Sequence, residues 1–115
     1  MHELSVAIGI VELAEEEALK AGGTKIDSIE LVIGKLSGIE IDSLDFVWSS
    51  ATMGTMLEKA ERITIQPEGK ARCMECGNEF DIESLYDCCQ NCNSYFKDII
   101  QGKELQVKSI TINEK

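Results

Sequence analysis

The sequence predicts an α+β fold in which a small three-stranded sheet and two helices carry an inserted cysteine-rich subdomain. Three observations predict it. Residues 4–21 repeat apolar side chains at helical spacing, three short segments alternate apolar and polar residues as strands do, and two Cys-x-x-Cys pairs stand between the second and third of these segments. The last strand is therefore expected to complete a sheet that the insert interrupts.

The first helix is predicted over residues 4–21 and is ended by the glycine pair that begins at Gly22. Its predicted buried stripe follows i, i+3, i+4, i+7 spacing and comprises Leu4, Ala7, Ile8, Val11, Ala14 and Ala18. Val6, Ile10 and Leu13 lie outside that stripe, so the first half of the helix is apolar on nearly all sides. Two buried faces, or a surface that contacts another protein, would each explain this pattern.

The three strands are predicted at residues 25–33, 61–67 and 104–112. The side chains expected to point inward from the first two are Ile29, Leu31, Ile33, Ile63 and Ile65. The alternation changes phase within the third strand, and a β-bulge near Lys108-Ser109 would restore it.

The second helix is predicted to begin at Asp42 as its N-cap, with Asp45 three residues later in a capping-box position, and to end near Gly54. Its expected buried face comprises Leu44, Val47, Trp48 and Ala51. The segment from Met56 to Ala60 is expected to be a connector.

Length and composition place limits on the kind of protein. A chain of 115 residues with 43% apolar content is expected to form one domain, or a small domain with a metal-stabilised extension. The net charge of −10 and the scattering of the 11 basic residues argue against a nucleic-acid partner. We also expect no membrane span, because no apolar run approaches the roughly 20 residues that a bilayer requires. Five cysteines without a recognisable signal peptide favour the reducing cytosol, where paired cysteines are more often metal ligands than disulfides.

The two Cys-x-x-Cys pairs, Cys73/Cys76 and Cys89/Cys92, have the spacing of a zinc ribbon. A two-residue gap lets one tight turn aim both sulfurs at a single point, and two such turns supply the four corners of a tetrahedron. Gly77 follows the first pair where the turn needs a positive φ, and Asn93 follows the second pair in the same place. A structural Zn²⁺ is the favoured ligand, and a rubredoxin-like iron or disulfides are the alternatives.

Cys88 adds a fifth thiol beside the second pair. Its use in place of Cys89 would leave a three-residue gap to Cys92, which fits the geometry of the first turn less well. We therefore interpret Cys88 as a spare thiol that is open to oxidation if exposed.

The amino terminus holds the only histidine of the chain, His2. A histidine at a frayed terminus can be accidental, but here the amine of Met1, the backbone nitrogen of His2 and its imidazole can close fused chelate rings around one metal. The backbone nitrogen of Glu3 is a further donor. Nitrogen donors in a square plane suit Ni²⁺ or Cu²⁺.

Met-His-Glu at the start of a helix, the two late cysteine pairs and the run Gly102-Lys103-Glu104-Leu105 resemble the HypA/HybF nickel metallochaperones of [NiFe]-hydrogenase maturation. The resemblance covers essentially the whole chain. It implies that His2 anchors nickel, that Glu3 contributes, and that Glu40, in the loop before the second helix, completes the site. It further implies that Cys73, Cys76, Cys89 and Cys92 hold structural zinc. The departures from the family pattern are Gln90, where proline is common, and the additional Cys88.

The resemblance also implies a division into a nickel-binding domain, residues 1–67 and 103–115, and a zinc-binding ribbon, residues 68–102. The expected function is that of a cytoplasmic nickel carrier that works with a GTPase and loads a hydrogenase large-subunit precursor; whether it is a homodimer stays open. We do not expect an enzyme, because no Ser/His/Asp set and no phosphate-binding glycine loop are present. A zinc-ribbon interaction or regulatory module without nickel transfer is the main alternative, and a one-iron electron carrier is a third.

Overall fold

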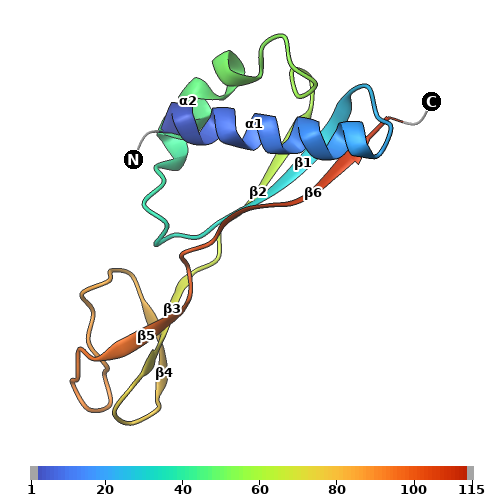
Figure 1. Cartoon of the computed structure of the whole chain (residues 1–115). Helices are drawn as coiled ribbons and strands as arrows, with labels where there is room; N and C mark the ends of the chain where they lie inside the picture. The colour runs from blue at the N-terminus through green and yellow to red at the C-terminus, as the bar shows by residue number, and fades with distance from the viewer. Residues whose placement is uncertain (1–2, 114–115) are drawn as a thin grey trace. The chain divides into compact units, whose positions relative to one another are not determined.

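The computed structural model describes residues 3–113 and contains two helices and two three-stranded sheets (Figure 1). In chain order the elements are α1 (Glu3–Lys20), β1 (Ile26–Ile33), α2 (Ile41–Thr52), β2 (Glu61–Ile65), β3 (Gly69–Cys73), β4 (Glu79–Ile82), β5 (Lys97–Gln101) and β6 (Leu105–Ile112). The strand order is β2-β1-β6 in one sheet and β4-β3-β5 in the other. The α+β class is therefore confirmed, and the last strand completes the first sheet as predicted.

The chain divides into two compact units. The first comprises Met1–Leu31, Ile39–Thr64 and Gln106–Lys115, and the second comprises Val32–Gly38 and Ile65–Leu105. The second unit contains all of the predicted ribbon at 68–102, and it also takes in the loop that follows β1.

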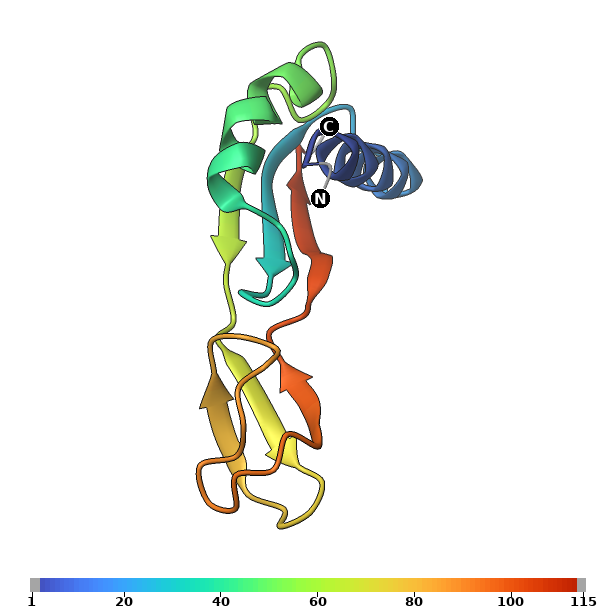
Figure 2. The ribbon, with the colours of Figure 1, turned by 90° about the vertical axis from the view of Figure 1, so that its left-hand side faces the viewer.

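The sheet of the first unit joins a parallel pair to an antiparallel one. In Figure 2 the arrows of β1 and β2 run in the same direction, and β6 runs against them. Parallel neighbours cannot be joined by a tight turn, and α2 lies in the connection between β1 and β2. This βαβ arrangement leaves β2 and β6 as the two edges of the sheet.

Helix α1 buries four of the six residues of the predicted stripe, and Ile10 in addition. Its buried side chains are Ala7, Ile10, Val11, Ala14 and Ala18. Leu4 and Ile8, predicted to be buried, are 47% and 44% exposed. The buried face is rotated toward Ile10. Three of its residues are alanines, whose small side chains let the helix backbone lie close to the elements that it packs against. The glycine pair terminates the helix after Lys20, as predicted: the N–H of Gly23 donates to the carbonyl of Ala18 at 2.9 Å in a Schellman motif, with Gly22 at φ 83°.

The predicted N-cap of α2 is wrong. The N-cap residue is Glu40, whose own side chain makes no capping hydrogen bond, and Asp42 lies inside the first turn. A carboxylate in the first turn is still favoured by the helix dipole. Asp45 forms an ion pair with Arg62 instead of a capping box. Of the predicted buried face, Leu44 is fully buried, and the other three residues are half-buried.

The phase predicted for β2 is also wrong. Ile63 and Ile65 are 43% and 36% exposed, whereas Arg62 and Thr64 are the less exposed residues. The guanidinium of Arg62 lies 5.0 Å from the ring centroid of Trp48 on α2. The apolar stem of an arginine can be buried while its cationic end stacks on an aromatic ring, and this contact fixes the face that β2 turns toward the helix.

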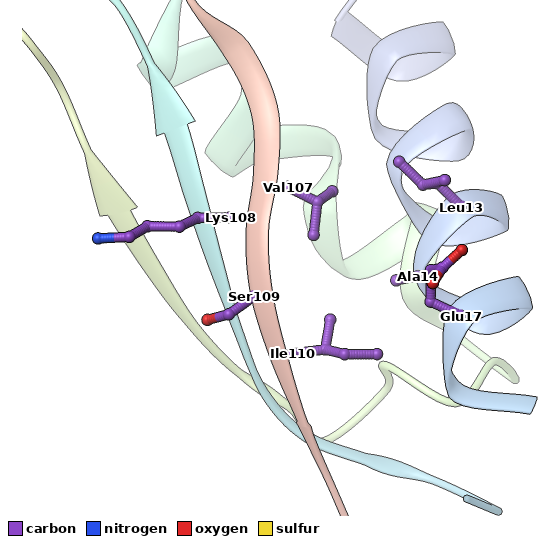
Figure 3. Close-up of a pocket in the computed structure, with 7 residues that line it drawn as sticks. All are labelled: Leu13, Ala14, Glu17, Val107, Lys108, Ser109 and Ile110. Atoms are coloured by element: carbon purple, nitrogen blue, oxygen red, sulfur yellow. The ribbon is translucent and has the colours of Figure 1, made fainter. Parts of the chain in front are cut away.

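Strand β6 changes phase where the sequence predicts. Figure 3 shows Val107 and Ile110 on the side of α1, with Lys108 and Ser109 on the opposite side. The hydroxyl of Ser109 donates to Glu30 on β1 at 3.1 Å. Two consecutive outward residues between two inward ones are the arrangement that a β-bulge produces.

Within residues 3–113, no helix is long and apolar enough to cross a bilayer.

Candidate metal centre

The first cysteine pair spans the last residue of β3, Cys73, and the turn that follows the strand. The N–H of Cys73 donates to the carbonyl of Asn78 at 2.8 Å, and the N–H of Gly77 donates to the carbonyl of Cys73 at 2.9 Å. Gly77 has φ 78°, which only glycine adopts without cost. The N–H of Cys76 lies 3.5 Å from the sulfur of Cys73, so the backbone of the turn donates to the thiol that it carries.

The second pair repeats this turn. The N–H of Cys89 donates to the carbonyl of Ser94 at 2.8 Å, and the N–H of Asn93 donates to the carbonyl of Cys89 at 2.7 Å. Asn93 has φ 63° and is the one described residue other than glycine with a positive φ. The sequence prediction of positive φ at Gly77 and Asn93 is therefore confirmed.

The two turns bring four sulfurs together. The Sγ atoms of Cys73, Cys76, Cys89 and Cys92 lie within 4.8 Å of one another. The sulfurs of Cys73 and Cys92 are 3.5 Å apart, and those of Cys76 and Cys89 are 3.7 Å apart. Four sulfurs at about 2.3 Å from a tetrahedral Zn²⁺ stand about 3.8 Å from one another. The spacing therefore fits a zinc ion, and the fifth thiol, Cys88, is not part of the cluster.

The cluster is closed on one side and reachable on the other. Cys73 and Cys89 are buried, whereas Cys76 and Cys92 are exposed. Two side-chain amides point at the sulfurs: Asn78 Nδ2 lies 3.8 Å from Cys89 Sγ, and Asn91 Nδ2 lies 3.5 Å from Cys76 Sγ. Such donors stabilise thiolates and orient metal ligands.

The hydrogen bonds of the two turns favour thiolates at the first cysteine of each pair. A hydrogen bond from the backbone N–H of Cys76 is the main cause that lowers the pKa of Cys73. Burial raises the pKa of Cys89, but hydrogen bonds from the backbone of Cys92 and Asn91 and from two side chains outweigh it and bring the pKa to about 6.

The four sulfurs need a bound cation before all of them can be thiolates. A backbone hydrogen bond from Ser94 lowers the pKa of Cys92, yet the neighbouring sulfurs and burial raise it to about 12. Several thiolates cannot share so small a space without a positive ion. A divalent cation removes this repulsion, and with four protein sulfurs it has no open position for a substrate. The arrangement is therefore suited to a structural metal ion.

A second group of predicted ligands lies at the start of the two helices. Glu3 is the first residue of α1, and Glu40 immediately precedes α2. The Glu3 carboxylate accepts a hydrogen bond from the backbone N–H of Glu40 at 3.1 Å, which brings these two sequence-predicted residues together. The predicted ligands Met1 and His2 lie outside the described residues.

Sequence reasoning missed the strands that frame the cluster. β3 pairs antiparallel with both β4 and β5, and Ala71 lies between Phe80 and Ile99. The sequence signal for β3 is the alternation of small and charged residues from Gly69 to Cys73. In the structure these residues are, in order, buried, half-buried, buried, exposed and buried. The signal is weak because β3 contains no large apolar side chain.

Comparison with known proteins decides the family. A family model described as hydrogenase/urease nickel incorporation, metallochaperone, hypA matches residues 1–112. The chain belongs to the HypA family. HypA proteins are maturation factors that act as metallochaperones, which agrees with the sequence-based expectation of a nickel-handling protein.

Named relatives cover nearly the full length. The hydrogenase maturation factor HypA of Chlorobaculum tepidum is 44% identical over 112 residues, which is 97% of this chain and 99% of that protein. The protein of the same name from Parabacteroides distasonis is 46% identical over 114 residues, which is 99% of both chains.

Solved HypA structures share the fold. A solution structure of a HypA protein superposes with a TM-score of 0.72 at 25% identity and covers 98% of this chain and 97% of that one. The solution structure of the Ni metallochaperone HypA from Helicobacter pylori also gives a TM-score of 0.72, at 24% identity, with full coverage of both chains.

Proposed function

We propose that this protein binds Ni(II) at its amino terminus and delivers it for the maturation of a [NiFe]-hydrogenase. Membership of a family of nickel-incorporation metallochaperones supports nickel as the cargo. The observation that carries the location is the hydrogen bond that the backbone N–H of Glu40 donates to the Glu3 carboxylate, because it brings two predicted ligand residues together. A ligand set that starts at residue 1 would have both within reach.

The donor set suits nickel that must later be released. The Met1 amine, the backbone nitrogen and imidazole of His2, and the Glu3 backbone are nitrogen donors, and Glu40 adds a carboxylate that is exposed. Imidazole and deprotonated amides favour Ni(II) in a planar geometry. Amine, ring and amides must lose protons to bind, so affinity should rise with pH and stay moderate at neutral pH.

The four-cysteine cluster has a separate task in this proposal. It holds zinc as part of the fold, because its four sulfurs converge at a spacing that fits a tetrahedral ion and leave no ligand position for exchange. Zinc would then stay on the protein while nickel comes and goes.

The proposed partners are a nickel-handling GTPase and the precursor of the hydrogenase large subunit, in the cytoplasm. The family name includes urease as well as hydrogenase, so an apo-urease is the alternative recipient. Paired cysteines that act as metal ligands are typical of a reducing compartment, which suits the proposed zinc cluster.

Calorimetric titration with Ni²⁺ tests the proposal. Untagged zinc-loaded protein should bind one nickel, and His2→Ala should abolish stoichiometric binding while leaving zinc and the circular dichroism spectrum unchanged. Glu40→Gln should weaken binding by about tenfold or less, because only one peripheral ligand is altered. Glu58→Gln, which alters another exposed acid in the connector after α2, is the matched control and should bind like the wild type. Equal nickel binding by wild type and His2→Ala would favour a zinc-ribbon adaptor without nickel transfer.

A further inference from the structure

The side of the first unit formed by α1 and β6 contains a groove that the metal sites do not use. Its volume is about 350 Å³, and the residues that line it are Leu13, Ala14, Glu17, Val107, Lys108, Ser109 and Ile110. Figure 3 shows Leu13, Ala14 and Glu17 on α1 on one side of this groove, and Val107 and Ile110 on β6 on the other. Leu13 is 46% exposed. Leu13 is one of the apolar residues of α1 that lie outside the buried face of the helix.

The strand that borders the groove is an edge strand. Among the described residues, β6 neighbours only β1 in the sheet, so its other side has no strand to pair with its N–H and C=O groups. An edge strand beside an apolar groove can accept an added strand, which gains backbone hydrogen bonds from the edge and places alternate side chains in the groove. Eight residues, Leu105–Ile112, are available for such pairing.

The rim of the groove is acidic. Helix α1 carries five glutamates and a single lysine, Lys20, which lies 3.6 Å from Glu17. Glu17 lines the groove, and at 100° per residue Glu16 is next to Leu13 on the solvent side of the helix. An added strand would therefore meet carboxylates next to its apolar contacts.

We propose that the α1/β6 groove, defined by the seven residues above, docks an extended segment of a partner protein in which apolar residues alternate with lysine or arginine. The segment pairs with the free edge of β6, its apolar side chains cover Leu13, Val107 and Ile110, and its cations meet Glu16 and Glu17. The docking goes beyond nickel binding, since no predicted metal ligand contributes to it.

A second copy of this chain is a poorer occupant. Each chain carries a net charge of −10. In a symmetric pair joined through β6, the glutamates of one α1 helix would lie near those of the other. The Lys108 side chains of the two strands would also lie near each other. Like charges at such close range disfavour association. The change of phase at Lys108-Ser109 works against regular self-pairing as well.

The groove is tested with a displayed library of random ten-residue segments, selected on full-length, zinc-loaded protein. The expected result is enrichment of segments that alternate apolar residues with lysine or arginine. Synthetic versions should slow hydrogen exchange of the β6 amides, and a matched peptide with glutamate in place of the cations should not bind. Enrichment of helical or acidic segments, enrichment of none, or binding without protection of β6 would each overturn the proposal.

Variants locate the contact. Leu13→Glu should weaken binding of a selected peptide by about tenfold or more, because a central apolar contact is lost. Leu19→Glu, on the same helix but outside the groove and 66% exposed, should leave it unchanged. Glu17→Lys should weaken binding, whereas Glu61→Lys makes the same change of charge on the distant edge strand β2 and should not. Equal effects within either pair would contradict the assignment.

Self-association is measured on the same samples by sedimentation. A monomer in the absence of peptide is expected. A dimer whose β6 amides are protected without any peptide would show that a second copy occupies the groove, and the proposed partner would be wrong.

Discussion

The carboxylate of Glu3 caps α2 from another helix. The side chain of Glu40, the N-cap residue, makes no capping bond, yet its backbone N–H is satisfied by Glu3 at 3.1 Å. The start of α2 is thus fixed by the start of α1, and the residue proposed as a nickel ligand also helps to hold the two helices together. An acid at this position is favoured by the positive end of the α2 dipole.

Replacing Glu3 should therefore affect stability as well as nickel binding. Glu3→Ala should lower the free energy of unfolding of the first unit by about 1 kcal/mol, the usual cost of losing a cap, and Glu3→Gln should cost less because its amide oxygen still accepts. Urea unfolding followed by the fluorescence of Trp48, the only tryptophan of the chain, reports on this unit. An alanine variant as stable as the wild type would show that the hydrogen bond contributes nothing.

At the scale of elements, the two cysteine turns together form one metal-binding site. Each has two equivalent backbone hydrogen bonds and a residue of positive φ at the same position, Gly77 or Asn93, and neither turn alone could place four sulfurs within 4.8 Å. Structural zinc sites of this type contribute about 10 kcal/mol or more in apparent binding free energy. The second unit has few large buried side chains, so we expect its fold to depend on the ion.

Cys76→Ala and Cys88→Ala form a matched pair that tests this dependence. Cys76→Ala should lose zinc and make residues 65–105 sensitive to protease, because three sulfurs leave the ion exposed and the turns unconnected. Cys88→Ala, which removes the adjacent thiol outside the cluster, should keep one zinc per chain and full protection. Elemental analysis and limited proteolysis give the answer, and retention of both properties by Cys76→Ala would rule out a structural ion.

The loop after β1 belongs to the second unit, where it packs tightly against the residues that precede β6. The N–H of Gly34 donates to the carbonyl of Glu104 at 2.8 Å, and that of Leu36 donates to Gly102 at 2.7 Å. A Cβ on Gly34 would lie 2.0 Å from the carbonyl oxygen of Gly102, which is backbone and cannot rotate away.

Gly34→Ala should accordingly lower the free energy of unfolding of the second unit by about 3 kcal/mol or more, the upper range for overpacking. Gly9→Ala is the opposite case, because an added Cβ there meets nothing within 4 Å in the middle of α1. It should stabilise the first unit by about 0.5–1 kcal/mol. Thermal unfolding by circular dichroism compares the two. A Gly34→Ala protein with wild-type stability would mean that the loop is not packed as described.

For the whole molecule, periodicity and cysteine spacing were enough to predict the class, the order of the predicted elements and the convergence of the paired cysteines. They failed where a tertiary contact decides. The phase of β2 depends on Arg62 stacking on Trp48, and the cap of α2 depends on Glu3, 37 residues away in the chain. Strand β3, which lies at the centre of the second sheet, lacks large apolar residues, so alternation alone could not identify it.

Charge gives a prediction for the molecule as a whole. With a net charge of −10 and no cluster of basic residues in the sequence, the protein should not bind duplex DNA even at about 50 mM salt, where phosphate contacts are strongest. Fluorescence anisotropy with a labelled duplex measures this directly. Salt-sensitive binding would support a regulatory zinc ribbon over a carrier.

The central claim is that the first atoms of the chain hold nickel while the sulfur cluster holds zinc. The most direct measurement is a count of both metals on one sample of a chain with one extra residue before Met1, dialysed against Ni²⁺ beside the unextended protein. We predict one zinc in each, with one nickel in the unextended chain and none in the extended one, because the extension converts the terminal amine to an amide. One nickel in both would contradict the claim.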